Sequence, residues 1–146
     1  MIISVFTRDI KLTCIYKFVM LQDQLKNLGA HLNIFVVREF YEFLQEVINK
    51  FENFPEYSSY CSLIKGLEII PCDHNDHLTY EMMSNDPIAK SGILDSDIVL
   101  LDVDRRLMIS IPPIKELISK TICCKFRSCN DLRYHQFLAL GNPIYY

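Results

Sequence analysis

Cysteine and histidine residues gather in two parts of the 146-residue chain, where they could bind a metal ion. The first group lies in Cys72-Asp73-His74-Asn75-Asp76-His77, and the second consists of Cys123, Cys124 and Cys129. Zinc takes four nitrogen or sulfur ligands in a tetrahedron. If the two segments meet, the ligands are Cys72, His74, Cys124 and Cys129, in a structural zinc site. The spacing is not that of a standard zinc knuckle, and in the alternative interpretation the cysteines are small buried hydrophobic residues.

The same residues allow a thiol enzyme as a further hypothesis. A cysteine would be the nucleophile, and the base would be one of His74, His77 and His135. Lys125 and Arg127 flank Cys124 and could lower the pKa of its thiol. However, nothing in the sequence orders these groups, and the chain has no Gly-rich phosphate loop, no GxSxG and no HExxH. We therefore predict no catalytic residue, no enzyme activity and no small-molecule substrate.

Four aspartates lie close together in the sequence, at positions Asp95, Asp97, Asp102 and Asp104. Such a group could bind Mg²⁺ or Ca²⁺. However, Asp97 and Asp102 flank a predicted strand, and no EF-hand pattern is present. The simpler interpretation is that these residues end the strand and form its turns.

The C-terminal segment 115–146 is basic, although the chain as a whole has a net charge of −3. Residues 1–114 contain 10 Lys and Arg and 16 Asp and Glu, whereas residues 115–146 contain 5 and 2. Cations interleaved with aromatic residues can pair with phosphates and stack on unpaired bases. The predicted RNA or partner contacts are Lys115, Lys120, Lys125, Phe126, Arg127, Arg133, Tyr134, Tyr145 and Tyr146. In the alternative, the aromatic residues are core and the charges face water.

These patterns favour a non-enzymatic binding factor that docks on a ribonucleoprotein, such as the ribosome, through its basic C-terminal segment. The first alternative is a protein–protein interaction module, such as a viral or parasite modulator, that uses a Phe-rich helix over residues 33–53 or the acidic body. The second alternative is the thiol- or metal-dependent enzyme. The pattern matches no named RNA-binding module.

The chain is expected to be cytoplasmic and to have no membrane partner. Its apolar start has no basic region and is interrupted at Arg8-Asp9, unlike a signal peptide. No apolar stretch reaches the ~18 residues that a membrane span requires. Without a secretion signal, the 6 cysteines are expected to be reduced thiols or metal ligands.

The elements that would position these residues begin with an N-terminal β-hairpin, because apolar and polar residues alternate over 10–19 after a first strand at 2–7. A short helix is predicted over 21–28, with Gly29 in the left-handed position after it. Asn33 is the predicted N-cap of a long helix over 33–53. Pro55 then begins a helix that Gly66 ends, and residues 67–70 form a strand.

The second half of the chain is less regular. Residues 71–97 are predicted to be a long loop, because they contain helix and strand breakers that include Pro87 and Gly92. A short helix is predicted within this loop at 78–84. Residues 97–102 and 107–111 form a second hairpin, followed by helices over 112–121 and 130–140. The predicted fold is therefore one α+β domain over 1–146, in which the two hairpins join a small mixed or antiparallel sheet packed by one long helix and several short ones.

Overall fold

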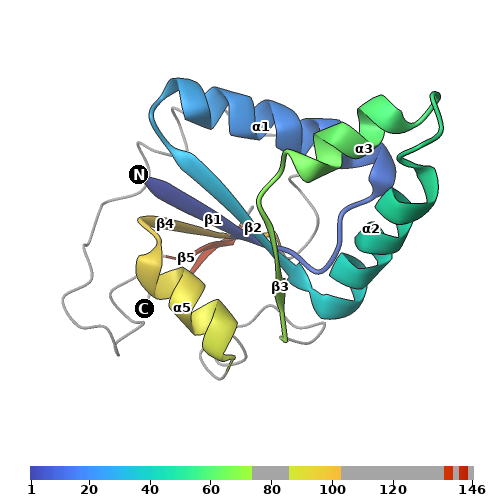
Figure 1. Cartoon of the computed structure of the whole chain (residues 1–146). Helices are drawn as coiled ribbons and strands as arrows, with labels where there is room; N and C mark the ends of the chain where they lie inside the picture. Colours follow the sequence, from blue (N-terminus) through green and yellow to red (C-terminus); the bar gives the residue numbers. More distant parts are fainter. Residues whose placement is uncertain (74–85, 103–136, 140–141, 145–146) are drawn as a thin grey trace.

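The protein contains a mixed sheet whose described strands have the order β3-β2-β1-β4-β5-β6 (Figure 1). The computed structural model describes residues 1–73, 86–102, 137–139 and 142–144. The strands are β1 (Ile2–Phe6), β2 (His31–Val37), β3 (Ile69–Cys72), β4 (Ile98–Leu101), β5 (Phe137–Ala139) and β6 (Asn142–Ile144). Neighbours from β3 to β5 pair in parallel, and β6 pairs antiparallel with β5.

Helices cover both faces of this sheet. The short 3₁₀ helix η1 (Leu12–Cys14) leads into α1 (Ile15–Asn27), which is followed later in the chain by α2 (Arg38–Phe51) and α3 (Ser58–Lys65). Buried residues of α1, α2 and α3 pack on one face of the sheet, and those of α5 (Pro87–Asp95) pack on the other. Strands that alternate with helices around a parallel sheet make this a doubly wound α/β architecture.

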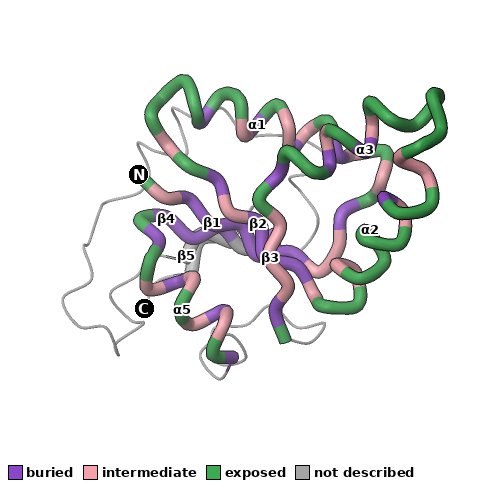
Figure 2. Tube along the Cα trace, in the orientation of Figure 1, coloured by how far each residue is buried: buried purple, intermediate pink, exposed green. Residues whose placement is uncertain are grey.

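The predicted α+β class with an antiparallel sheet is therefore wrong. Parallel strands in the middle of such a sheet are buried on both faces, so they are nearly continuously apolar and do not alternate with polar residues. In β1, Ile3 and Val5 pack with the cluster of α1, α2 and α3, whereas Phe6 packs with α5. The tube in Figure 2 accordingly shows the central strands as mostly buried.

The first strand at 2–7 is confirmed, but its predicted hairpin partner at 10–19 is wrong. Residues 15–27 form α1, whose buried stripe has helical spacing and consists of Ile15, Phe18, Leu21 and Leu25. The alternation over residues 10–18 thus overlaps the start of this longer stripe, which sets the structure of the segment. The predicted glycine cap is confirmed, because Gly29 has a φ of +73°. The N–H groups of Gly29 and Ala30 bond to the carbonyls of Lys26 and Leu25, which is the Schellman pattern.

The long helix predicted over 33–53 is confirmed only from Arg38, where α2 begins. Residues before it belong to β2, so Asn33 is not an N-cap. The β-branched residues Val36 and Val37 favour a strand. The helix starts where the backbone of Val37 leaves the sheet, with no side-chain cap.

The elements that follow α2 agree with their predictions in kind but not in every boundary. Helix α3 ends at Gly66, as expected, but it begins at Ser58 and not at Pro55, and β3 begins two residues after the strand predicted at 67–70. Strand β3 lies at the edge of the sheet. Ile34 N–H bonds to the Glu68 carbonyl, and N–H groups of a parallel strand face its neighbour at every second residue. The backbone of residue 71 therefore presents its N–H position to the open side of β3, away from β2. Pro71 has no N–H to present there, which protects the edge against further pairing.

Helix α5 lies within the stretch that was predicted to be an irregular loop. Asp86 caps it by accepting hydrogen bonds from the N–H groups of Ile88 and Ala89, and Pro87 occupies its first turn. Gly92 does not break the helix, because it gives room to a ring: a Cβ atom there would lie 2.3 Å from Cζ of Phe35. That ring stacks on Phe6, with centroids 4.6 Å apart. The predicted helix at 78–84 lies outside the described residues.

The last strands also correct the predicted topology. Strand β4 confirms the strand at 97–102, but it pairs in parallel with β1 on one edge and β5 on the other, so the hairpin with 107–111 is wrong. Residues 137–139 are strand β5 and not part of a helix over 130–140. The predicted helix at 112–121 lies outside the described residues, as do Tyr145 and Tyr146 at the end of the tail. In the portion of the chain that the structure describes, no helix is both long and apolar enough to cross a membrane.

Candidate functional site

The carboxyl end of the β1–β4 pair is the place where this architecture favours a ligand. From β1 the chain continues to β2 and β3 on one side, whereas β4 lies on the other side of β1. Open α/β sheets bind their ligands at such a reversal, beyond the carboxyl ends of the two strands. The residues that follow β1 are Thr7, Arg8 and Asp9, and the residue that follows β4 is Asp102.

Hydrogen bonds to the backbone fix the carboxyl ends of these two strands. Asp102 donates its N–H to the carbonyl of Phe6 at 2.9 Å, and Thr7 donates its N–H to the carbonyl of Phe35 at 2.9 Å. The Thr7 hydroxyl is buried and donates to the Asp9 carbonyl at 3.1 Å. The turn after β1 is therefore closed by its own threonine, without a glycine.

Two carboxylates at this edge of the sheet have buried oxygen atoms. Asp102 is only 2% exposed, and the Oδ2 atom of Asp102 and the Oδ1 atom of Asp9 are both buried. Asp9 and Asp102 are thus the two carboxylates of the described residues that follow β1 and β4 at the switch point.

The structure separates three of the four aspartates that lie close together in the sequence. Asp97 lies at the opposite, amino end of β4, where its Oδ2 accepts from Ile2 N–H at 2.8 Å, so it has the structural role expected for it. Asp95 is exposed at the end of α5. Asp102 was interpreted as a turn residue, and Asp104 lies outside the described residues.

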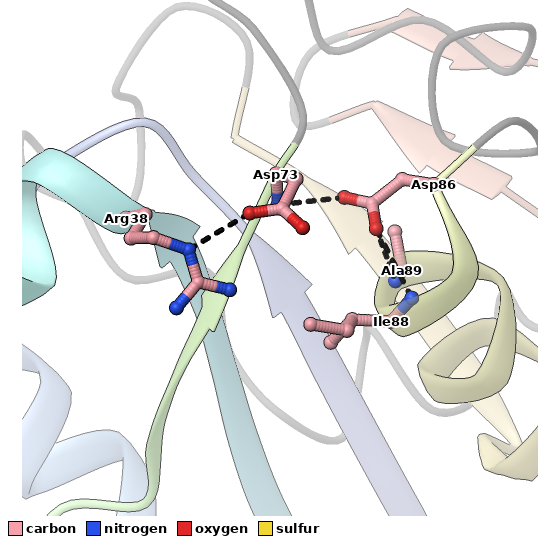
Figure 3. A network of polar contacts seen from close by, with 5 residues as sticks. All are labelled: Arg38, Asp73, Asp86, Ile88 and Ala89. Atoms are coloured by element: carbon pink, nitrogen blue, oxygen red, sulfur yellow. Dashed lines mark hydrogen bonds and ion pairs between the residues drawn. The ribbon is translucent and has the colours of Figure 1, made fainter.

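A second polar network lies at the carboxyl ends of β2 and β3 (Figure 3). The Nε atom of Arg38 contacts Oδ1 of Asp73 at 2.8 Å, and both side chains are largely exposed. Asp73 donates its N–H to Oδ2 of Asp86 at 2.9 Å, while the other carboxylate oxygen of Asp86 caps α5. The hydrogen bond to Asp73 and its charge raise the pKa of Arg38. This network joins α2, β3 and α5, so its carboxylates have structural partners.

Cys72, one of the predicted zinc ligands, is the last residue of β3 and is fully buried. Burial, followed by the charges of Asp86 and Asp73, raises the pKa of the Cys72 thiol from 9.0 to about 12. The thiol is consequently protonated at neutral pH and packs as a small apolar group. Zinc binding and nucleophilic attack both need a thiolate, which this environment disfavours.

The remaining predicted metal ligands, His74, Cys124 and Cys129, lie outside the described residues, as do the candidate bases His77 and His135. Among the residues that are described, no three His, Cys, Asp or Glu side chains group closely enough to hold a metal ion by themselves. The structural zinc site stays a prediction.

The predicted RNA contacts also lie outside the described residues, and so they stay predictions. The topology nevertheless shows how the basic part of the chain is attached. Because β4 and β5 are parallel neighbours, residues 103–136 connect the carboxyl end of β4 to the amino end of β5. The connection that carries Lys115 to Arg133 thus departs from Asp102, at the switch point itself.

A cavity of about 310 Å³ lies elsewhere, between α2, α3 and β3. Its apolar lining consists of Leu44, Ile48, Ile64, Leu67 and Ile69. Glu52 and Lys65 also line it and form an ion pair. Neither Asp9 nor Asp102 lines this cavity, which touches the sheet only beside β3, so we place the candidate site at the carboxyl edge of β1 and β4.

The sequence did not indicate Thr7 and Asp9 as site residues, because it predicts Thr7 at the end of the first strand and Asp9 in the turn of a hairpin. The signal that could have found them is a polar residue directly after each of two buried apolar runs, 2–6 and 98–101. Comparison of the chain with family models, curated proteins and solved structures finds no match.

Proposed function

We propose that the protein binds single-stranded RNA across the carboxyl edge of its sheet, with Mg²⁺ between Asp9, Asp102 and the RNA phosphates. The observation that carries this proposal is the position of these two carboxylates, each following one of the two strands that form the switch point. Mg²⁺ is commonly bound by one or two carboxylates together with phosphate oxygens of the ligand. A complete protein cage of three ligands is therefore not needed.

The charge of the edge explains why a cation belongs to the proposal. Asp9, Asp73, Asp86 and Asp102 all lie at the carboxyl ends of strands or at the start of α5. The described cations of this edge are Arg8, which follows β1, and Arg38, which is paired with Asp73, so the four carboxylates outnumber them. RNA phosphates would be repelled by such an edge unless a divalent cation bridged the two.

The basic connection supplies the second part of the proposed interface. Lys115, Lys120, Lys125, Arg127 and Arg133 belong to the segment that leaves the sheet at Asp102. Their contacts with phosphate would provide affinity, and the neighbouring aromatic residues would stack on bases. In this proposal the ribonucleoprotein partner is recognised through exposed single-stranded RNA.

The test is fluorescence anisotropy with a labelled single-stranded RNA, in Mg²⁺ and in EDTA. We expect EDTA, Asp102→Asn and Asp9→Asn each to weaken binding by about tenfold or more. Reversing Lys120, Lys125, Arg127 and Arg133 to Glu together should abolish binding, with a steep salt dependence in the parent protein. Asp95→Asn is the matched control, because the same charge is removed from an exposed position at the end of α5.

Two results would contradict the proposal in different ways. Binding that is equally tight in EDTA and in Asp102→Asn would exclude the metal-bridged edge. Binding that survives reversal of the four cations would exclude the basic connection as the RNA contact.

The burial of Asp102 favours a second candidate function, metal-assisted hydrolysis of the RNA backbone. A cation beside a carboxylate that is 2% exposed is poorly screened by water, and it can lower the pKa of a bound water. The measurement is the appearance of shorter RNA after incubation with Mg²⁺ or Mn²⁺, with Asp102→Asn as the inactive variant. RNA that stays intact in every incubation would exclude hydrolysis, and RNA binding would then be the only proposed function, in agreement with the prediction of a non-enzymatic protein.

A further inference from the structure

An aromatic stripe on α2 and the turn after it is a described feature that the proposed function does not use. Phe43, Val47 and Phe51 follow one another at four-residue spacing along the helix. Phe54 and Tyr57 follow the helix and contact Phe51, with ring centroids 6.1 Å and 5.2 Å from it. We define these five residues as the α2 aromatic stripe.

The stripe is open to solvent although its members are large and apolar. Phe43 is 45% exposed, Phe54 is 50% exposed and Tyr57 is 49% exposed. Val47 and Phe51 are half-buried beneath them. Single exposed apolar residues are common on protein surfaces, but contiguous ones mark interaction sites.

Charged residues beside the stripe indicate what covers it. Glu39, Glu42 and Glu46 lie along the exposed side of α2, and Glu56 lies between Phe54 and Tyr57. These acidic side chains repel nucleic acid and attract cationic groups. The Nζ atom of Lys50 already lies 5.5 Å from the centroid of the Phe51 ring, so a ring of the stripe accepts a cation over its face.

From these observations we infer that the α2 aromatic stripe docks a basic amphipathic helix of a partner protein. The apolar side of that helix would pack on Phe43, Phe51 and Phe54. Its Lys and Arg side chains would meet Glu39, Glu42 and Glu46 along one flank. This interaction surface is separate from the carboxyl edge and does not depend on RNA binding.

The probe is a labelled helical peptide of about 14 residues, long enough to follow α2, with Leu on one face and Lys on the other. A second peptide carries Glu in place of each Lys. We expect the basic peptide to bind and the acidic peptide not to bind, as measured by fluorescence anisotropy. Equal binding of both peptides, or of neither, would overturn the inference.

Variants of the protein locate the contact. Phe43→Ala combined with Phe54→Ala should weaken binding of the basic peptide by about tenfold or more. Glu42→Lys combined with Glu46→Lys should reverse the preference toward the acidic peptide. The matched control is Tyr16→Ala combined with Met20→Ala, which removes two equally exposed apolar residues from α1 and should leave binding unchanged.

Circular dichroism and thermal unfolding test whether each variant keeps the fold. We expect the fold to be retained, because Phe43 and Phe54 are about half exposed.

Unchanged peptide binding in the Phe43 and Phe54 variant would overturn the inference. Sedimentation velocity of the parent protein provides a further test. A dimer that this variant dissociates would mean that a second copy of the chain covers the stripe, which also contradicts the inference. Asp102→Asn should bind the peptide normally, so failure of the RNA proposal is distinguishable.

Discussion

The two ends of the β1–β4 pair use their aspartates differently. At the amino end, Asp97 accepts from Ile2 N–H and donates its own N–H to the Ile2 carbonyl, both at 2.8 Å. The hydroxyl groups of Ser4 and Ser96 form a hydrogen bond of 2.5 Å close to this end. At the carboxyl end, Asp102 and Asp9 turn carboxylate oxygens into the protein. The aspartate of the amino end thus holds two strands together through hydrogen bonds, whereas the carboxyl end carries two carboxylates with buried oxygens beside the switch point.

The difference teaches how to separate stability from function in this molecule. A substitution at the amino end removes a hydrogen bond that holds two strands together. A substitution of Asp102 by Asn retains the shape of the side chain and one acceptor oxygen, so the loss of stability is expected to be small. Loss of ligand binding with little loss of stability is therefore expected only at the carboxyl end.

The largest expected effect concerns Cys72, at the carboxyl end of β3. Because its pKa is raised to about 12, the thiolate fraction at pH 8 falls about 1000-fold below that of a cysteine with a pKa of 9.0. Iodoacetamide should therefore label Cys14, which is only half-buried, long before Cys72. Peptide mass spectrometry measures the two rates, and rapid labelling of Cys72 in the folded protein would show that its environment is wrong.

The same shift gives a pH dependence of stability. The folded-state pKa of Cys72 is raised, so its contribution is fully present below about pH 9 and is lost as the pH rises toward 12. Urea unfolding at pH 8 and pH 11, compared between the parent protein and Cys72→Ala, isolates this contribution. An identical pH dependence in both proteins would contradict it.

The next effect is steric, in the packing between α5 and the sheet. Gly92→Ala puts a methyl group 2.3 Å from Cζ of Phe35, a ring already stacked on Phe6, and should lower the free energy of unfolding by about 2 kcal/mol. Phe35→Leu combined with Gly92→Ala should recover part of the loss. Gly66→Ala is the control, because its methyl group would meet only ordinary contacts at 3.5 Å. Equal losses in the two single variants would refute the steric explanation.

Asp86 links the polar network of the carboxyl end to α5. Asp86→Ala removes the cap of α5 and the bond from Asp73 N–H, and should cost about 1 to 2 kcal/mol of unfolding free energy. Asp86→Asn keeps acceptor oxygen for the cap and should cost less. Urea denaturation curves measure both, and equal losses would mean that the cap contributes nothing.

The smallest effect is expected at the amino end itself. Asp97→Ala removes the hydrogen bond from Ile2 N–H at an exposed position, and should cost about 1 kcal/mol of unfolding free energy. RNA binding should remain as in the parent protein. A loss of RNA binding at this position, with the fold intact, would remove the distinction between the two ends.

Particular residues show how much the sequence could predict. Local chemistry sufficed for β1, for the cap at Gly29 and for the end of α3 at Gly66, because each depends on neighbouring residues. It was insufficient for β2, since a parallel strand buried on both faces has no alternation, and for α5, since Gly92 gives room to Phe35, which is distant in the sequence. Topology is non-local, so the pairing of β4 between β1 and β5 could not be read from residues 97–111.

The candidate site was hidden for the same reason. Asp102 was noticed as a carboxylate, but Asp9 was assigned to a hairpin turn, and nothing in the sequence placed the two at neighbouring strand ends. The two strand ends are neighbours because of the register between β1 and β4, in which Phe6 lies opposite Leu101.

The central claim is that Asp102 and Asp9 serve a ligand and not the fold. The most direct measurement is RNA affinity in Mg²⁺ together with thermal unfolding, for the parent protein, Asp102→Asn and the control Asp95→Asn. We predict that Asp102→Asn lowers RNA affinity by about tenfold or more while its melting temperature changes little, and that Asp95→Asn changes neither. Unchanged RNA affinity in Asp102→Asn with a lowered melting temperature would contradict the claim and make Asp102 a structural residue like Asp97.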